Sequence, residues 1–85
     1  MGELSRLPNI GKTVEEQLNA VGIHTAEELR RTGAEAAWLR IQGMDPSACI
    51  HRLLALEGAI RGVKKTELPP ERRTELKAFY ENRKK

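Results

Sequence analysis

Glycine and proline divide this chain into short segments, and none of the segments shows the alternating apolar and polar pattern of a β-strand. Charged residues recur at helical spacing throughout the 85 residues. Gly22, Gly33, Gly43 and Gly62 each follow such a segment, at the position where a helix is expected to end. The sequence therefore predicts an all-α fold, a compact bundle of about five short helices joined by connections of a few residues.

The helix starts and ends can be placed more closely. Thr25 followed by Glu28 has the spacing of a capping box, and Asp45 followed by Pro46 has the pattern of an N-cap with proline at the first helical position. A further short helical turn is expected at residues 4–7, and it should end at Pro8 because the residue before a proline is disfavoured in a helix. The expected helices cover residues 12–21, 26–32, 34–42, 46–61 and 70–83.

Leu, Ile, Val and Ala must supply most of the core, because Trp38, Phe79 and Tyr80 are the only aromatic residues. Trp38 is expected to be a partly buried packing residue, and Cys49 a core filler on the helix at 46–61. Leu76, Phe79 and Tyr80 are expected to form the inner face of the helix at about 70–83. A glycine inside a helix costs up to about 1 kcal/mol relative to alanine. Gly58 is therefore expected to mark a close crossing of two helices.

Length and composition exclude several classes of protein. Eighty-five residues are expected to make a single domain, residues 1–85. Cys49 is the only cysteine, so an intramolecular disulfide is excluded. The chain has no signal-peptide pattern at its start and no run of roughly 18 apolar residues for a membrane span. A soluble, cytoplasmic protein without a membrane partner is the default expectation.

The net charge of +3 is unevenly distributed along the chain. Residues 61–85 hold nine cations and four anions, whereas residues 1–60 hold six cations and eight anions. The basic end is the C-terminus, including the expected helix at about 70–83. Its candidates for contact with an anionic partner are Arg61, Lys64, Lys65, Arg73 and Lys77. The alternative for these cations is a solvated face balanced by nearby glutamates.

The turn at residues 9–12, with the sequence NIGK, is the candidate functional motif, and we call it the NIGK turn. The first turn of a helix has unpaired N–H donors and the positive end of the helix dipole, and phosphate is a common occupant of such a site. The candidate phosphate contacts are Gly11, Lys12 and Thr13.

Residues 7–29 have the spacing of a helix-hairpin-helix, a small element that grips the DNA backbone without reading sequence. The pattern Gly, apolar, Gly is matched at Ile10 and Gly11, while Asn9 stands in place of the first glycine and Glu15 in place of an alanine. Asn is tolerable there because it also adopts positive φ. Glu15 and Glu16 are expected to repel a phosphate at this turn. The alternative is a helix-entry turn that serves packing alone.

The blocks LPNIG, GIHTAEEL, GAEAAWLR and ALEGAIRG, in this order, resemble the C-terminal domain of the TfoX/Sxy bacterial competence regulators. The resemblance covers roughly residues 4–79. It implies an α-helical fold of helix-hairpin-helix kind and a role in regulating DNA-uptake genes. In that family the domain often follows an N-terminal α/β domain, which these 85 residues do not contain. The sequence leaves open whether the domain stands alone.

Two partner classes follow. The first hypothesis is weak, sequence-independent contact with duplex DNA through the NIGK turn. The alternative is a protein-interaction module that binds a transcription regulator, an N-terminal TfoX-type domain or a second copy. Catalytic residues, a cofactor and a metal site are not expected, since Cys49 and His51 point to different faces of a helix and His24 lies elsewhere.

Overall fold

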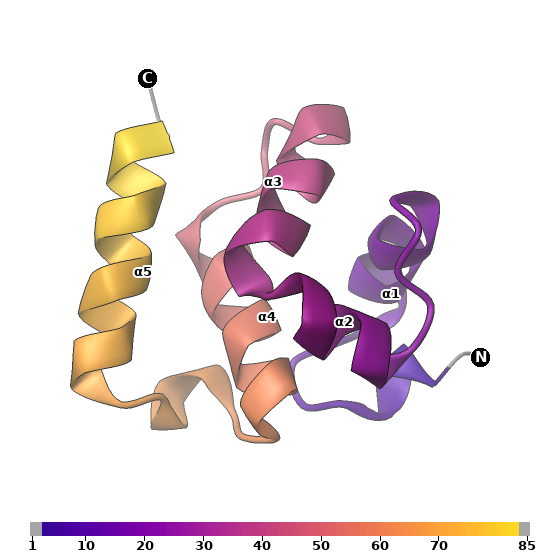
Figure 1. The fold of residues 1–85 in the computed structure, drawn as a ribbon, viewed down its shortest axis with the longest axis horizontal. Coiled ribbons are helices and arrows are strands. Elements are labelled where there is room, and N and C mark those ends of the chain that lie inside the picture. The colour runs from indigo at the N-terminus through magenta and orange to yellow at the C-terminus, as the bar shows by residue number, and fades with distance from the viewer. Residues whose placement is uncertain (1–2, 84–85) are drawn as a thin grey trace.

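The computed structural model describes residues 3–83 and contains five α-helices and two short 3₁₀ helices in that range (Figure 1). Within residues 3–83 there is no strand, so the prediction of an all-α bundle is confirmed. None of the described helices has the length and apolar character needed to cross a membrane. In chain order the elements are η1 (Leu4–Arg6), α1 (Lys12–Ala20), α2 (Ala26–Thr32), α3 (Ala34–Met44), α4 (Ile50–Arg61), η2 (Lys65–Glu67) and α5 (Pro70–Arg83).

Helix α4 lies at the centre of the fold and packs against α2, α3, α5 and η2. Helices α1 and α5 stand on opposite sides of this central group (Figure 1). Trp38 on α3 is fully buried, so the expectation of partial burial was wrong. Its ring meets Phe79 and Tyr80 edge-on, with centroid distances of 6.1 and 5.6 Å, and its Nε1 donates to the Cys49 carbonyl. Trp38 therefore joins α3 to α5 and to the start of α4.

Several helix ends follow the sequence closely. The hydroxyl of Thr25 accepts from the Glu28 amide, and the Glu28 carboxylate accepts from the Thr25 amide, so the capping box is confirmed. Gly62 ends α4 in the left-handed region, with φ 76°. The Val63 amide donates to the Gly58 carbonyl and the Gly62 amide to the Ala59 carbonyl, which is the Schellman pattern.

The connection between α3 and α4 differs from the prediction. α3 continues through Gly43 to Met44, and α4 begins at Ile50 rather than at residue 46. Asp45 accepts from the Ser47 amide, and the Ala48 amide donates to the Asp45 carbonyl, so this segment is a turn. Asp followed by Pro favours the first two positions of a type I turn as well as a helix start. Cys49 is half-buried at the N-cap of α4 and is not a core filler.

An ionic cluster holds α5 against α3 and α4. Arg72 on α5 pairs with Glu35 on α3 at 2.9 Å and with Glu57 on α4 at 3.1 Å. Burial alone would raise the pKa of Glu57, but hydrogen bonds from Arg72 and Arg61 outweigh this effect and lower it. The hydrogen bond to Glu57, together with those to Glu35 and Glu75, outweighs burial and raises the pKa of Arg72. Leu76 on α5 is buried, and Phe79 and Tyr80 are half-buried, which confirms the predicted inner face of this helix.

Candidate nucleic-acid interface

The NIGK turn connects η1 to α1, and its one residue with an unusual backbone conformation is Asn9. Asn9 has φ 69°, the only positive φ among the described residues other than glycine. The tolerance expected for Asn at this position is therefore confirmed. Gly11, by contrast, has φ −96°, which any residue adopts. A Cβ on Gly11 would meet no atom within 4 Å in the described part of the chain beyond its two neighbours in sequence. The fold therefore does not require a glycine at position 11.

The backbone N–H groups at the start of α1 are free. Gly11 is the N-cap and offers no side-chain acceptor, and the first helical bond runs from the Glu15 amide to the Gly11 carbonyl at 3.0 Å. Within residues 3–83 no group accepts from the amides of Lys12 and Thr13, and both residues are exposed, as is Gly11. The turn thus presents free donors at the positive end of the α1 dipole.

The side chain of Asn9 holds the NIGK turn against the C-terminal end of α4. Its Nδ2 donates to the carbonyls of Val63 at 3.0 Å and Ala55 at 3.4 Å, and its Oδ1 accepts from the Lys65 amide at 3.2 Å. A Cβ on Gly58 would lie 2.5 Å from Asn9 Nδ2 and 2.7 Å from the Val63 carbonyl oxygen. Gly58 therefore leaves room for the Asn9 side chain and for the backbone of the segment that follows α4. The expectation that Gly58 marks a close crossing of two helices was wrong.

Glu15 is turned into the molecule rather than toward solvent. Only 6% of this residue is exposed, and its Oε2 accepts from the Ser5 amide at 3.2 Å. Its carboxylate therefore ties α1 to η1, a role that its place in the pattern did not indicate. Glu16 remains exposed, so of the two carboxylates expected to repel a phosphate only this one faces solvent.

Comparison with known proteins places this geometry in a family. The profile of the TfoX C-terminal domain matches residues 1–80. The chain belongs to the TfoX C-terminal domain family. It is 40% identical over 73 residues to Protein Sxy of Escherichia coli K12, covering 86% of this chain. The match takes in 35% of Protein Sxy, so the chain spans about a third of that relative's length.

Two solved structures have the same fold as this TfoX C-terminal domain. Both are crystal structures of a protein from Listeria monocytogenes, one in a triclinic form and described as uncharacterized, the other in a tetragonal form and described as of unknown function. Each is 44% identical in sequence, with TM-scores of 0.92 and 0.91. Both matches cover 93% of the present chain, and they cover 90% and 96% of the Listeria chains.

The TfoX domain separates its C-terminal cations by environment. Lys64 is exposed and Lys65 half-buried, and both lie in the segment that Asn9 holds beside the NIGK turn. Arg61 is half-exposed but pairs with Glu57 at 2.6 Å, so its charge is already balanced. The fold therefore brings the lysine pair to the candidate motif.

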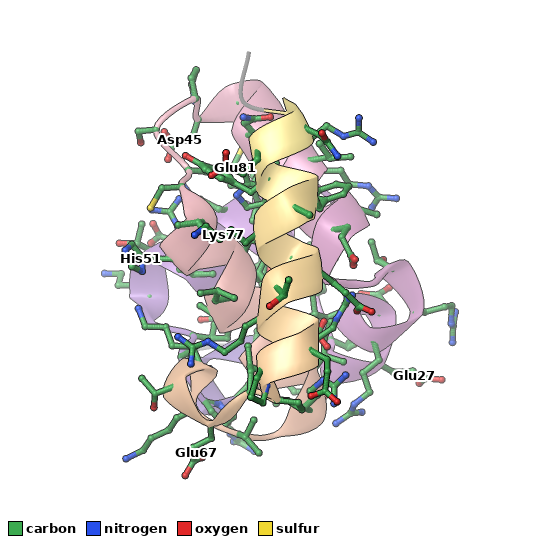
Figure 2. The ribbon with its side chains drawn as sticks, turned by 90° about the vertical axis from the view of Figure 1, so that its left-hand side faces the viewer. Glu27, Asp45, His51, Glu67, Lys77 and Glu81 are labelled. Carbon is green, nitrogen blue, oxygen red and sulfur yellow. The ribbon has the colours of Figure 1, made fainter. Side chains whose placement is uncertain are left out.

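Arg73 and Lys77 occupy another part of the surface, at the seam between α4 and α5. Figure 2 shows Lys77 pointing sideways from α5, toward the side on which His51 lies. His51 is exposed, and among the described residues no three His, Cys, Asp or Glu side chains converge to hold a metal ion. The roles that the sequence did not reveal are those of Asn9 as an anchor, Glu15 as a link from α1 to η1 and Arg72 as the centre of the ionic cluster. Gly58 was the available signal for the first.

Proposed function

We propose that this TfoX C-terminal domain is a non-enzymatic regulatory module of competence regulation that contacts the backbone of duplex DNA without reading its sequence. The contact is made by the NIGK turn, with Gly11, Lys12 and Thr13 around one phosphate. The observation that carries the proposal is that the amides of two exposed residues at the start of α1, Lys12 and Thr13, have no acceptor within residues 3–83. Such amides bind phosphate without needing a particular side chain.

The surroundings of the turn also support the binding of phosphates there. Asn9 holds the turn rigidly, so the amides need no reordering when a ligand arrives. Lys64 and Lys65 stand in the adjoining segment and supply further positive charge for neighbouring phosphates. With Lys12 this gives three lysines, and a dependence of log affinity on log salt with a slope of about −3 would follow.

The test is fluorescence anisotropy with a labelled duplex, measured over a series of salt concentrations. We expect Lys12→Glu to weaken binding and to make the salt slope shallower by about one unit. Arg40→Glu is the matched control, because Arg40 is exposed on α3 and has no ion pair among the described residues. Binding that ignores both salt and Lys12→Glu would overturn the proposal.

The competing function is docking on a transcription regulator, on an N-terminal TfoX-type domain or on a second copy, with no direct DNA contact. If this alternative is right, the domain does not bind the duplex, and light scattering or a titration with the isolated partner shows a complex. The free amides of the NIGK turn favour the DNA proposal, because unpaired N–H groups at a helix N-terminus are suited to a phosphate.

A further inference from the structure

A shallow groove runs between α4 and α5, and it is separate from the NIGK turn in its residues. Its volume is about 170 Å³, and it is lined by Ile50 and Leu54 of α4 and by Arg73, Thr74 and Lys77 of α5. Pockets for small molecules usually measure roughly 300–1,000 Å³. The groove is therefore too small for a cofactor but large enough to receive one aliphatic side chain.

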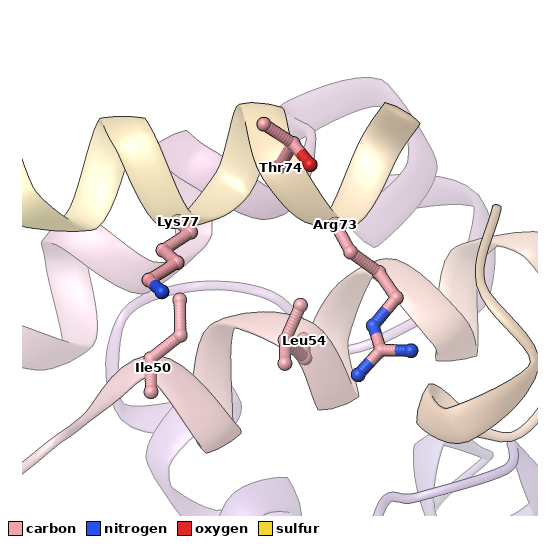
Figure 3. A pocket seen from close by; sticks show the side chains of 5 residues that line it. All are labelled: Ile50, Leu54, Arg73, Thr74 and Lys77. Atoms are coloured by element: carbon pink, nitrogen blue, oxygen red, sulfur yellow. The ribbon is translucent and has the colours of Figure 1, made fainter. Parts of the chain in front are cut away.

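The floor and the rim of the groove differ in chemistry. Ile50 and Leu54 are one helical turn apart and half-buried, so they form an apolar floor. Figure 3 shows Lys77 beside Ile50 and Arg73 beside Leu54, so the two cations flank this floor. The Thr74 hydroxyl donates to the Pro70 carbonyl at 3.0 Å and is already satisfied.

The cations of the rim have no carboxylate partner within residues 3–83. Neither Arg73 nor Lys77 forms an ion pair there, whereas the neighbouring Arg72 contacts three carboxylates. Arg72 thus points inward from α5 onto Glu35 and Glu57. The other two cations, Arg73 and Lys77, border the apolar floor of the groove. A partner that supplies both apolar area and negative charge would complement this arrangement.

We propose that the α4–α5 groove binds an acidic amphipathic peptide segment of another protein. One aliphatic side chain of the peptide rests on Ile50 and Leu54, and carboxylates one helical turn apart face Arg73 and Lys77. One turn of a helix rises about 5.4 Å, so cations at positions 73 and 77 match carboxylates spaced i, i+4 on a bound helix. A phosphate backbone would leave the apolar floor unfilled, which favours a peptide here over DNA.

This binding function is additional to DNA contact, since it uses none of Gly11, Lys12 and Thr13. The probe is a fluorescein-labelled peptide with one leucine flanked by glutamates at helical spacing, titrated with the intact domain. Two matched peptides carry Gln for Glu or Ala for Leu. We expect each change in the peptide to weaken binding about tenfold, because one removes the charge pairs and the other the buried side chain.

Variants of the domain test the same contacts from the other side. Arg73→Glu with Lys77→Glu is expected to weaken peptide binding about tenfold, by loss of two pairs and gain of repulsion. Arg30→Glu with Arg40→Glu is the matched control, because both residues are exposed and neither forms an ion pair among the described residues. Circular dichroism and Trp38 fluorescence confirm that each variant is folded.

Ile50→Ala distinguishes peptide binding from DNA binding, because it removes part of the apolar floor of the groove and leaves every charge in place. It should weaken binding of the leucine peptide and leave binding of a labelled duplex unchanged. The proposal is overturned if the glutamate peptide shows no saturable binding, or if the glutamine peptide binds equally well. It is also overturned if the Arg30 and Arg40 control loses as much affinity, or if the groove variants lose affinity for DNA alone.

Discussion

Asn9 and Gly58 lie 49 positions apart in the chain and pack directly against each other, since the side-chain amide of Asn9 occupies the space that a Cβ on Gly58 would fill. The Asn9 side chain reaches past Gly58 to bond the carbonyls of Ala55 and Val63. Gly58 itself accepts from the Val63 amide at the end of α4. One glycine therefore allows both the helix end and the NIGK turn to be held at the same place.

Gly58→Ala should destabilise the domain even though alanine favours a helix. The propensity gain is about 1 kcal/mol, but the new Cβ would press on the Val63 carbonyl, which is backbone and cannot turn aside. Because overpacking costs about 1–3 kcal/mol, we expect a net loss of about 1 kcal/mol in urea denaturation. Gly43→Ala is the control, since Gly43 is helical with open space around it and should gain stability. Equal gains at both positions would contradict the packing described.

Asn9→Gly and Asn9→Ala separate the two roles of this residue. Both remove the bonds to Ala55, Val63 and Lys65, but glycine tolerates the positive φ and alanine does not. We expect losses of about 2 kcal/mol for glycine and about 1 kcal/mol more for alanine. Hydrogen exchange should quicken at the Lys65 amide in both variants. Full protection of that amide would show that Asn9 does not anchor the turn.

Local chemistry explains which parts of the fold could be read from the sequence. The capping box at Thr25, the left-handed Asn9 and the inner face of α5 depend on residues within a turn or two of each other. The Asp45–Pro46 pair was misread because the same residue types suit a helix start and a turn. Gly43 was misread as a helix end, since α3 continues through it to Met44, two residues beyond the predicted end at residue 42.

The contacts that position the candidate site join distant segments, and periodicity cannot specify them. Asn9 meets the end of α4, Glu15 folds inward to η1, and Arg72 bridges α3 and α4. Each of these polar residues looks like a surface residue in its local pattern. The sequence therefore predicted the NIGK turn as a candidate but not what holds it or which cations stand beside it.

Arg72→Ala should destabilise the domain by about 2 kcal/mol, less than the roughly 3–5 kcal/mol for a fully buried pair. The cause is that Glu57 is almost fully buried and keeps only Arg61 as a partner, while Glu35 loses its own. Trp38 is the only tryptophan and contacts α5, so its fluorescence reports whether that helix stays docked. Arg73→Ala, at an exposed cation that has no ion pair within residues 3–83, should change stability by less than about 0.5 kcal/mol.

Acid should weaken the α3–α4 turn through Asp45. Hydrogen bonds from Ser47 and Gln17 lower the pKa of Asp45 to about 2 from the ordinary value of 3.8. A carboxyl with a depressed folded pKa stabilises the fold above its unfolded pKa and loses that effect as pH falls through the folded pKa. Wild type should therefore lose stability relative to Asp45→Asn between about pH 4 and pH 2. Parallel stability curves over this range would show that Asp45 is not coupled to folding.

Gly11→Ala tests whether the NIGK turn is a phosphate-binding site or a turn that serves packing alone. Gly11 has an ordinary φ and open space around it, so the expected cost is only that of alanine in place of glycine at an N-cap, about 0.5–1 kcal/mol in the free energy of unfolding. A methyl group in front of the free amides should nevertheless hinder the approach of a phosphate, and affinity for the labelled duplex should fall several-fold. Gly43→Ala, equally open but on α3, should bind the duplex like wild type. Unchanged DNA affinity in Gly11→Ala would mean that the amides at the start of α1 are not where DNA is held.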